Sequence, residues 1–385
     1  MLSIPAALSY GLREKLQSED QLGKTGMKHL FITGVFRSGT SLLSTALNVH
    51  PDVLVGWQPF WLFFKECRNK FFKDVIGAPI DPEYPMGVLQ FRSEDESKLF
   101  QDVLNQVQFS NSELASVIHK IKAYLLDKSE KINTNMKPAA LSKHIDDLES
   151  GSAGHVLKQL LERLYLAETR KLDRDQIEVV GIKEVFCEEY VGPILNHDDL
   201  NFAVFHVIRD PRGIVASRNY GRYFKATGCK YPIFFMIRSW RRTVAQYVQN
   251  MGHESYLMMK YEELVRDPEE RLREVCSTLG LEFAEDLLNF DKYTDASGKR
   301  WQSNSSFESV TGIDTSPINR WKEILPKEEV ELIEYWCHRE IELLGYELTT
   351  KAFDRDKICG FQQDMSHVKP WLRSYDFSME RGCVK

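Results

Sequence analysis

The residues best suited to chemistry in this sequence lie in a short glycine-bearing loop, residues 34–41. Gly34 and Gly39 are separated by four residues, and two hydroxyl residues follow directly. An apolar run at residues 30–33 predicts a buried strand before the loop, and an amphipathic segment predicts a helix after it. In such a strand–loop–helix unit, backbone N–H groups and the positive end of a helix converge on an anion. The loop is therefore a candidate phosphate site.

One position departs from the nucleotide P-loop pattern GxxxxGK[ST]. Thr40 stands where that pattern has lysine, and the cation is supplied earlier, by Arg37. Because the P-loop lysine serves the β- and γ-phosphates, the loop is poorly suited to a triphosphate with magnesium but still suits a 5′-phosphate-type anion. Two other classes of function remain open. One is a P-loop kinase or nucleotide hydrolase with Asp210 at a metal-binding strand end, and the other is a non-catalytic nucleotide-binding protein.

Composition places the chain among ordinary water-soluble proteins. It has 385 residues, of which 43% are hydrophobic and 28% charged, and its formal net charge is −6. This length allows one large α/β domain or two modest ones, and the acidic balance argues against nucleic acid or an anionic membrane as the main partner. A membrane span needs a run of about 18 apolar residues, and the chain has none. The amino terminus is a poor signal peptide.

Seven scattered cysteines form no CxxC motif. Scattered cysteines in odd number are typical of reduced thiols rather than of a disulfide framework or a zinc site. Together with the amino terminus, they predict a cytoplasmic protein.

Further apolar runs alternate with predicted helices along the chain. They lie at residues 177–185, 202–208 and 256–261. This alternation predicts a three-layer α/β/α fold with a central parallel sheet, whose ligand site lies at the carboxyl ends of the strands. Residues 73–176 carry helical periodicity without a chemical motif, and we interpret them as a helical insertion that covers the site. The predicted organisation is a leader at residues 1–27, a domain at 28–350 and a carboxyl-terminal extension at 351–385.

A second anion site is predicted after the strand at residues 202–208. Arg209 leaves that strand, and Ser217 lies within the helix that follows. A guanidinium and a hydroxyl so placed could share one phosphate. Arg37, Lys183 and Arg209 all fall at or just beyond strand ends, so we expect them to lie near one another.

The two motifs GVFRSGTS and VIRDPRGIVASR together resemble those of the sulfotransferase family, whose members use 3′-phosphoadenosine 5′-phosphosulfate as donor; the nearest likeness is to bacterial and tyrosylprotein-type members. By motif match, the resemblance implies that Arg37, Ser38, Gly39, Thr40 and Ser41 hold the 5′-phosphosulfate. It further implies that Arg209 and Ser217 hold the 3′-phosphate, that Tyr261 borders the adenosine, and that Arg320 returns to the donor's phosphate. The matched segments are residues 28–60 and 178–345.

The catalytic residues follow partly from charge and partly from this resemblance. Lys183 could stabilise the negative charge that builds on the bridging oxygen of the donor as the S–O bond breaks. A preorganised cation has the same role in acyl or phosphoryl transfer. The family's usual bases are missing, because their matched positions read Gln58 and Val185. Glu184 is then the nearest carboxylate that could act as general base. Alternatively, the acceptor needs only Gln58 for orientation.

We therefore predict a metal-independent enzyme that transfers a sulfuryl group from this donor to a hydroxyl, or to an amine or carbamoyl nitrogen, of a small molecule, and that releases adenosine 3′,5′-bisphosphate (PAP). An aromatic-rich entrance after the first loop (Trp57, Phe60, Trp61, Phe64) is compatible with an apolar or cationic acceptor. The acidic residues Glu184, Glu188 and Glu189 also favour a cationic acceptor. The sequence does not indicate an oligomeric state.

Overall fold

The computed structural model describes residues 27–80, 91, 93–128, 138–167, 176–295, 299–301, 313–369 and 372. Most of the predicted leader (residues 1–26) and part of the predicted carboxyl-terminal extension lie outside the described residues. The predicted domain boundaries stay predictions.

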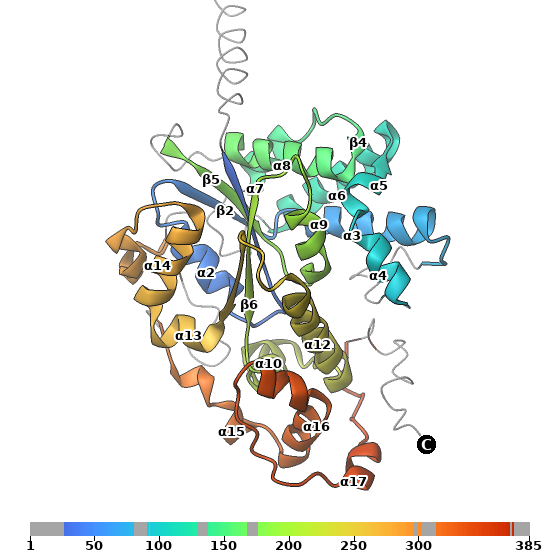
Figure 1. Ribbon diagram of the computed structural model, residues 1–385, viewed down its shortest axis with the longest axis vertical. Helices are drawn as coiled ribbons and strands as arrows, with labels where there is room; N and C mark the ends of the chain where they lie inside the picture. Colours follow the sequence, from blue (N-terminus) through green and yellow to red (C-terminus); the bar gives the residue numbers. More distant parts are fainter. Residues whose placement is uncertain are drawn as a thin grey trace, which may run out of the picture.

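A five-stranded parallel sheet organises the molecule (Figure 1). Its strand order is β2-β5-β1-β6-β7. The strands are β1 (Lys28–Thr33), β2 (Val53–Trp57), β5 (Val179–Lys183), β6 (Phe202–Ile208) and β7 (Tyr256–Lys260). β5, β1 and β6 are buried along almost their whole length, as expected for parallel strands with helices on both faces.

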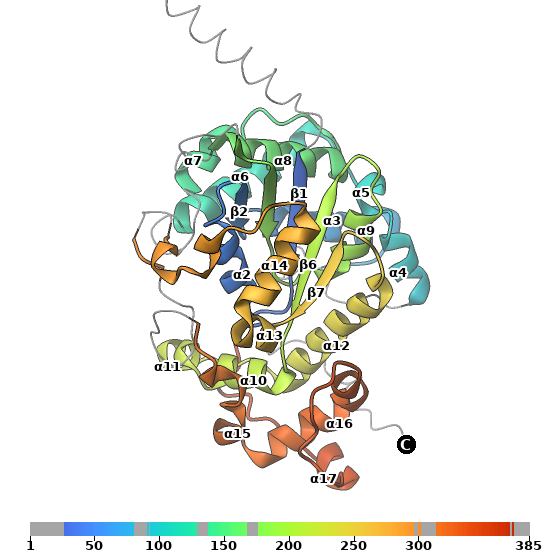
Figure 2. The ribbon, with the colours of Figure 1, turned by 60° about the vertical axis from the view of Figure 1, so that its left-hand side comes forward.

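Helices cover both faces of this sheet (Figures 1 and 2). On one face, α2 (Thr40–Leu47) and α14 (Pro268–Leu279) pack with the strands in one apolar cluster. On the other, α8 (Ala153–Ala167), α9 (Val191–Leu195) and α12 (Ile233–Asn250) contact β5 and β6. The predicted three-layer α/β/α fold with a central parallel sheet is thereby confirmed.

The described part of the stretch predicted as a helical insertion is largely helical. It contains α4 (Glu94–Phe100), α5 (Val103–Gln106), α6 (Asn111–Lys128), α7 (Pro138–His144) and α8, together with the short antiparallel strands β3 (Gln108–Phe109) and β4 (Gly151–Ser152). α8 does more than cover the site, because it packs on β5 and so forms part of a helical layer of the core.

The remaining helices surround these layers. They are α3 (Trp61–Lys70), which continues as a π-helix over Phe71–Val75, α10 (Pro211–Asn219), α11 (Arg222–Thr227), α13 (Tyr261–Arg266), α15 (Trp321–Ile324), α16 (Lys327–Leu343) and α17 (Arg355–Cys359). Short 3-10 turns lie at Glu188–Tyr190, Glu285–Leu288, Phe290–Lys292 and Ser316–Ile318.

The aromatic residues that follow the first loop divide into two groups. Phe60, Phe63 and Phe64 are fully buried in the core, so they cannot form an entrance. Trp57 and Trp61 remain partly exposed. The prediction of an aromatic entrance is therefore wrong for Phe60 and Phe64.

One cysteine differs from the expectation that all the cysteines are reduced thiols. Cys67, Cys187, Cys229, Cys276 and Cys337 are free thiols, whereas Cys359 is disulfide-bonded. The prediction that the cysteines are reduced is thus wrong at Cys359. Because disulfides are rare in reducing compartments, this removes one ground for the cytoplasmic location, which stays a prediction.

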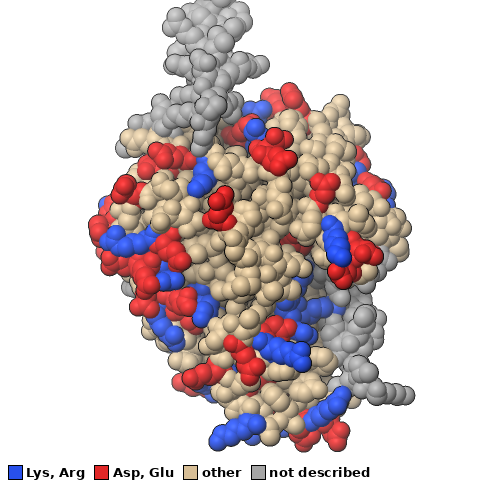
Figure 3. All heavy atoms as spheres, viewed as in Figure 1, with Lys and Arg blue, Asp and Glu red and all other residues tan. Residues whose placement is uncertain are grey.

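Figure 3 shows acidic and basic side chains interspersed over one face of the molecule. Among the described residues, no helix is both long and apolar enough to span a membrane. Within the same residues, no group of three or more His, Cys, Asp and Glu side chains is arranged to hold a metal ion. The expectations about nucleic acid, membrane and metal stay predictions.

A buried ion pair between Arg212 and Glu334 joins α10 to α16. Both side chains are at most 2% exposed. We expect Glu334→Ala to lower the free energy of unfolding by about 3–5 kcal/mol, because it leaves part of a buried charge uncompensated. Glu94→Gln, which breaks the exposed Lys98–Glu94 pair, should cost less than about 1 kcal/mol. Urea denaturation of both variants measures the difference, and equal losses would contradict the assignment.

Candidate active site

The carboxyl ends of the five strands meet at one edge of the sheet, and each strand leads directly to a residue singled out by its chemistry. β1 runs into the loop that carries Arg37, and β5 ends at Lys183. Arg209 follows β6, Gln58 follows β2, and Tyr261 follows β7. The structure therefore places these five side chains at the edge where parallel sheets bind ligands.

The loop at residues 34–41 approaches its neighbours too closely for side chains at either glycine. A Cβ atom at Gly34 would lie 2.3 Å from the Val207 carbonyl oxygen, and one at Gly39 would lie 2.5 Å from Cδ2 of Tyr261. Gly39 also has a φ of 101°, in the left-handed region that favours glycine. Both glycines are thus required by packing as well as by the turn.

The two predicted anion sites are in direct contact. Arg37 Nε donates a hydrogen bond to Ser217 Oγ at 3.0 Å, and Arg209 Nη1 donates to the Arg37 carbonyl oxygen, also at 3.0 Å. Arg209 Nη2 donates to the Pro317 carbonyl oxygen at 2.9 Å. Burial, together with the charges of Arg209 and Arg218, lowers the pKa of Arg37 to about 10, so Arg37 stays protonated at neutral pH. The site therefore concentrates positive charge at the junction of the two motifs.

Each of the two predicted anion sites contains a buried donor atom that has no protein partner among the described residues. These atoms are Ser38 Oγ, on a side chain that is 1% exposed, and Arg209 Nε, on a side chain that is 5% exposed. The helix α2 begins beside them at Gly39, which has no side chain with which to cap it. Buried donors of this kind fit an anion, because an unpaired buried polar group is otherwise costly.

Lys183, the last residue of β5, has a buried side chain. Its Nζ donates to Gln58 Oε1 at 3.2 Å and lies 4.1 Å from the ring centroid of Trp57. Burial, together with the charge of Arg37, lowers the pKa of Lys183 to about 7, although Glu184 opposes this shift. The amine is thus only partly protonated near neutrality in the absence of a ligand.

Trp57 connects this lysine to the first loop. Its Nε1 donates to Ser41 Oγ at 3.1 Å. Thr40, the neighbouring hydroxyl residue, is buried. The Trp57–Ser41 contact was not predicted, because it depends on β2 lying next to β5.

Glu184 is fully buried directly after Lys183. Its Oε1 accepts a hydrogen bond from the Phe60 backbone N–H at 2.7 Å, at the start of α3, and its Oε2 has no partner among the described residues. Burial raises the pKa of this carboxyl to about 8, although the Phe60 hydrogen bond opposes the shift. Glu184 could therefore cap the start of α3 through Oε1, while Oε2 could accept a proton.

Glu188 and Glu189 do not form an acidic entrance. Both are buried, and they pair with arginines of the core: Arg242 contacts Glu188 at 3.1 Å, and Arg68 contacts Glu189. The acidic neighbourhood that favoured a cationic acceptor is therefore neutralised within the protein.

A cavity of about 320 Å³ opens beside Arg37 and Gln58. Its other walls include Phe36, Trp61 and Tyr124, so the predicted insertion contributes to it through α6. Phe186 also lines the cavity. Three of the lining residues have positive φ values: 67° at Arg37, 48° at Gln58 and 59° at Phe186. They are the non-glycine residues with positive φ within the described residues. Such strain tends to occur at functional sites.

Tyr261 and Arg320 differ in how closely they join this arrangement. The Arg209 guanidinium carbon lies 4.3 Å from the ring centroid of Tyr261, whose ring also lies against Gly39. Arg320 donates to Ser316 Oγ at 2.8 Å, and its segment reaches the site through the Pro317 carbonyl that Arg209 contacts. The donor roles of both residues stay predictions.

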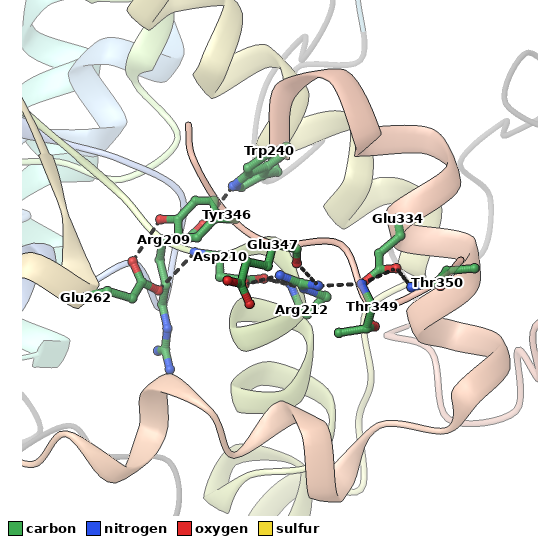
Figure 4. Close-up of polar contacts among 10 residues, drawn as sticks. All are labelled: Arg209, Asp210, Arg212, Trp240, Glu262, Glu334, Tyr346, Glu347, Thr349 and Thr350. Atoms are coloured by element: carbon green, nitrogen blue, oxygen red, sulfur yellow. Dashed lines mark hydrogen bonds and ion pairs between the residues drawn. The ribbon is translucent and has the colours of Figure 1, made fainter. Parts of the chain in front are cut away.

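A buried polar network holds the backbone around Arg209 (Figure 4). The Trp240 indole N–H donates to the Arg209 carbonyl oxygen at 2.8 Å. Glu262 accepts from the Asp210 N–H at 3.1 Å and from the Tyr346 hydroxyl at 2.8 Å. Because Asp210 is also hydrogen-bonded to Arg212, it is used structurally rather than as a free metal ligand.

Tyr124 and Arg218 line the cavity but were missed by sequence reasoning. Arg218 directly follows Ser217, so its position next to a predicted phosphate ligand was a usable signal. Tyr124 comes from a helix with no chemical motif, and no signal in the sequence marks it.

The fold defines an α/β protein with a central parallel sheet, whose strand ends bring the two predicted anion sites into contact. Residues 29–285 match the model of the sulfotransferase family. The chain belongs to this family, as its motifs predicted.

Individual relatives are distant. Carbohydrate sulfotransferase 2 of Homo sapiens is 25% identical over 375 residues, and the match covers 83% of this chain and 65% of that protein. Carbohydrate sulfotransferase 5 of Mus musculus is 22% identical, with 83% and 80% covered. Among solved structures, the sulfotransferase domain from the curacin biosynthetic pathway is 17% identical, with a TM-score of 0.47, and 84% of this chain and 98% of that chain are covered.

The pKa of Lys183, about 7, predicts pH-dependent affinity for PAP. The cationic form binds an anion and predominates below this pKa, so affinity should fall as pH rises through about 7, by up to tenfold per pH unit. Calorimetry from about pH 6 to about pH 9 measures this. Lys183→Met should lose the decline above pH 7 and keep only the rise in affinity that ionisation of the phosphate itself produces as pH increases through about 6. An identical decline in both proteins would contradict the role of Lys183.

Proposed function

We propose that this protein transfers a sulfuryl group from 3′-phosphoadenosine 5′-phosphosulfate to a hydroxyl group of a small acceptor in the 320 Å³ cavity. The observation that carries the proposal is the hydrogen bond between Arg37 and Ser217, which unites the two motifs that resemble the family's donor site. The names of the relatives support a carbohydrate as the acceptor class.

The donor side of the reaction is assigned to two groups of residues. Around the first loop, Ser38 Oγ and the N–H groups at the start of α2 would hold the 5′ end, with Arg37 supplying charge. Arg209 and Ser217 would hold the 3′-phosphate, and the unpartnered Nε of Arg209 supports this. When bound, the donor supplies the sulfuryl group and leaves as PAP.

The transfer itself is assigned to Lys183 and Glu184. Glu184 does not itself line the cavity, so it would take the proton of the acceptor hydroxyl through one intervening water. The proton moves while the new oxygen–sulfur bond forms and the bond between sulfur and the bridging oxygen of the donor breaks. The electron pair of that bond stays on the bridging oxygen, where Lys183 would stabilise the charge. Glu184 has a pKa near 8, which suits a base that works close to neutrality.

Arginine and lysine variants separate binding from chemistry. We expect Arg37→Ala and Arg209→Ala to abolish PAP binding, since each removes a cation from the donor site. Lys183→Ala should instead reduce turnover by about 10²–10³-fold, with a smaller effect on binding. Calorimetry with PAP and transfer of labelled sulfate from the donor measure the two effects. Unimpaired PAP affinity in both arginine variants would overturn the donor-site assignment.

A glutamine at position 184 distinguishes the two uses of Glu184. Gln keeps an acceptor for the Phe60 N–H but cannot take a proton. If Glu184 is the base, Glu184→Gln should lower kcat by about 10²–10⁴-fold and remove a limb from the pH–rate profile. If Glu184 only caps α3, kcat and the pH profile should stay unchanged while the melting temperature shifts.

A further inference from the structure

The cavity beside Arg37 contains a second arginine that the donor-site assignment does not use. Arg218, on α10, lines this cavity together with Arg37, Trp61 and Tyr231. It is 6% exposed. A buried guanidinium that faces a cavity needs an explanation, because arginine is almost never buried unless it is paired.

The partners of Arg218 are aromatic rings. Its guanidinium carbon lies 3.4 Å from the ring centroid of Tyr223, 3.9 Å from that of Tyr231 and 5.7 Å from that of Phe36. Cation–π contacts of this kind offset part of the loss of hydration. They also hold the planar group in a fixed orientation.

Arg218 differs from the buried arginines Arg68 and Arg212, and resembles Arg209, in lacking a carboxylate counter-charge among the described residues. Arg68 pairs with Glu189, and Arg212 pairs with Asp210 and Glu334. For Arg218, no carboxylate lies within ion-pair distance in the part of the chain that the structure describes. A buried cation that is left without an anion carries a large desolvation cost, which a bound anion would remove.

The surroundings of the cavity reinforce this positive charge. Arg37 lines the same cavity, and Lys369 Nζ lies 5.0 Å from the ring centroid of Tyr223. Among the described residues that line the cavity there is no Asp or Glu. Glu184, the acid next to Lys183, is fully buried and is not among the described residues that line the cavity.

We propose that Arg218 is a specificity-determining residue that binds a carboxylate of the acceptor, so that the preferred substrates are hydroxylated acids, such as acidic sugars, rather than neutral or cationic molecules. The planar fork of a guanidinium matches a carboxylate in two hydrogen bonds. Trp61 and Tyr231 would pack against the body of the acceptor. This inference rests on the proposed function, since it concerns the acceptor of the same site.

Binding to the PAP-saturated protein tests the proposal without requiring turnover. The probes are methyl glucuronide and methyl glucoside, which share a ring and differ in a carboxylate. We expect the wild type to bind the acid at least about tenfold more tightly, as a charged hydrogen bond allows, and Arg218→Gln to lose that preference. Equal binding of the two probes, or an unchanged preference in Arg218→Gln, would overturn the proposal.

Two further variants serve as controls. Arg241→Gln makes the same change on an exposed arginine of α12 and should leave the preference intact. Arg218→Lys keeps the charge without the planar fork and should retain part of it. If Arg218→Gln does not fold, as judged by its melting temperature, the preference in Arg218→Lys decides: an undiminished preference would contradict the proposal.

Sulfate transfer to the same two probes separates this inference from the proposed function. Binding of the acid that depends on Arg218, with no transfer of labelled sulfate to any acceptor, would leave the inference standing and overturn the proposed function. Equal transfer to both probes, unchanged in Arg218→Gln, would overturn the inference and leave the proposed function standing.

Discussion

The structure depends on an accumulation of positively charged side chains. Arg37, Lys183, Arg209 and Arg218 gather at the carboxyl edge of one parallel sheet, where the charge of Arg37 helps to lower the pKa of Lys183. Such crowding is unfavourable in the empty protein, because like charges in a partly desolvated site repel one another. An anion with several charges relieves that repulsion, so the same crowding that costs stability provides affinity. The donor of the sulfotransferase family, with groups at both its 3′ and 5′ ends, is an anion of this kind.

The surrounding fold holds these cationic side chains in place although their charges repel one another. Asp210, Glu262 and Tyr346 fix the backbone from which Arg209 emerges, and the Trp240 indole holds the Arg209 carbonyl (Figure 4). None of these contacts neutralises the Arg209 side chain, which donates to main-chain carbonyls instead of to a carboxylate. Asp210 and Glu262 thus stabilise the scaffold, and neither of them pairs with the Arg209 guanidinium.

Much of the sheet and of the proposed donor site could be located from the sequence, because both depend on local patterns. The apolar runs of β1, β5, β6 and β7 and the glycine loop are continuous in the chain, and parallel topology then brings their ends together. β2 was missed, since its short run, Val53–Trp57, merges into the aromatic segment that forms α3. The acceptor side could not be predicted, because it depends on tertiary packing instead of on local patterns. Tyr124 reaches the cavity only through the packing of α6, and Glu188 and Glu189 are buried against arginines that are distant in the sequence.

The most direct test of the central claim is the structure of the protein bound to PAP. Our account predicts the 5′-phosphate against the loop at residues 34–41, and the 3′-phosphate against Ser217 and the Nε of Arg209, with the adenosine next to Tyr261. A nucleotide bound elsewhere, or one whose phosphates avoid both Arg37 and Arg209, would contradict the account.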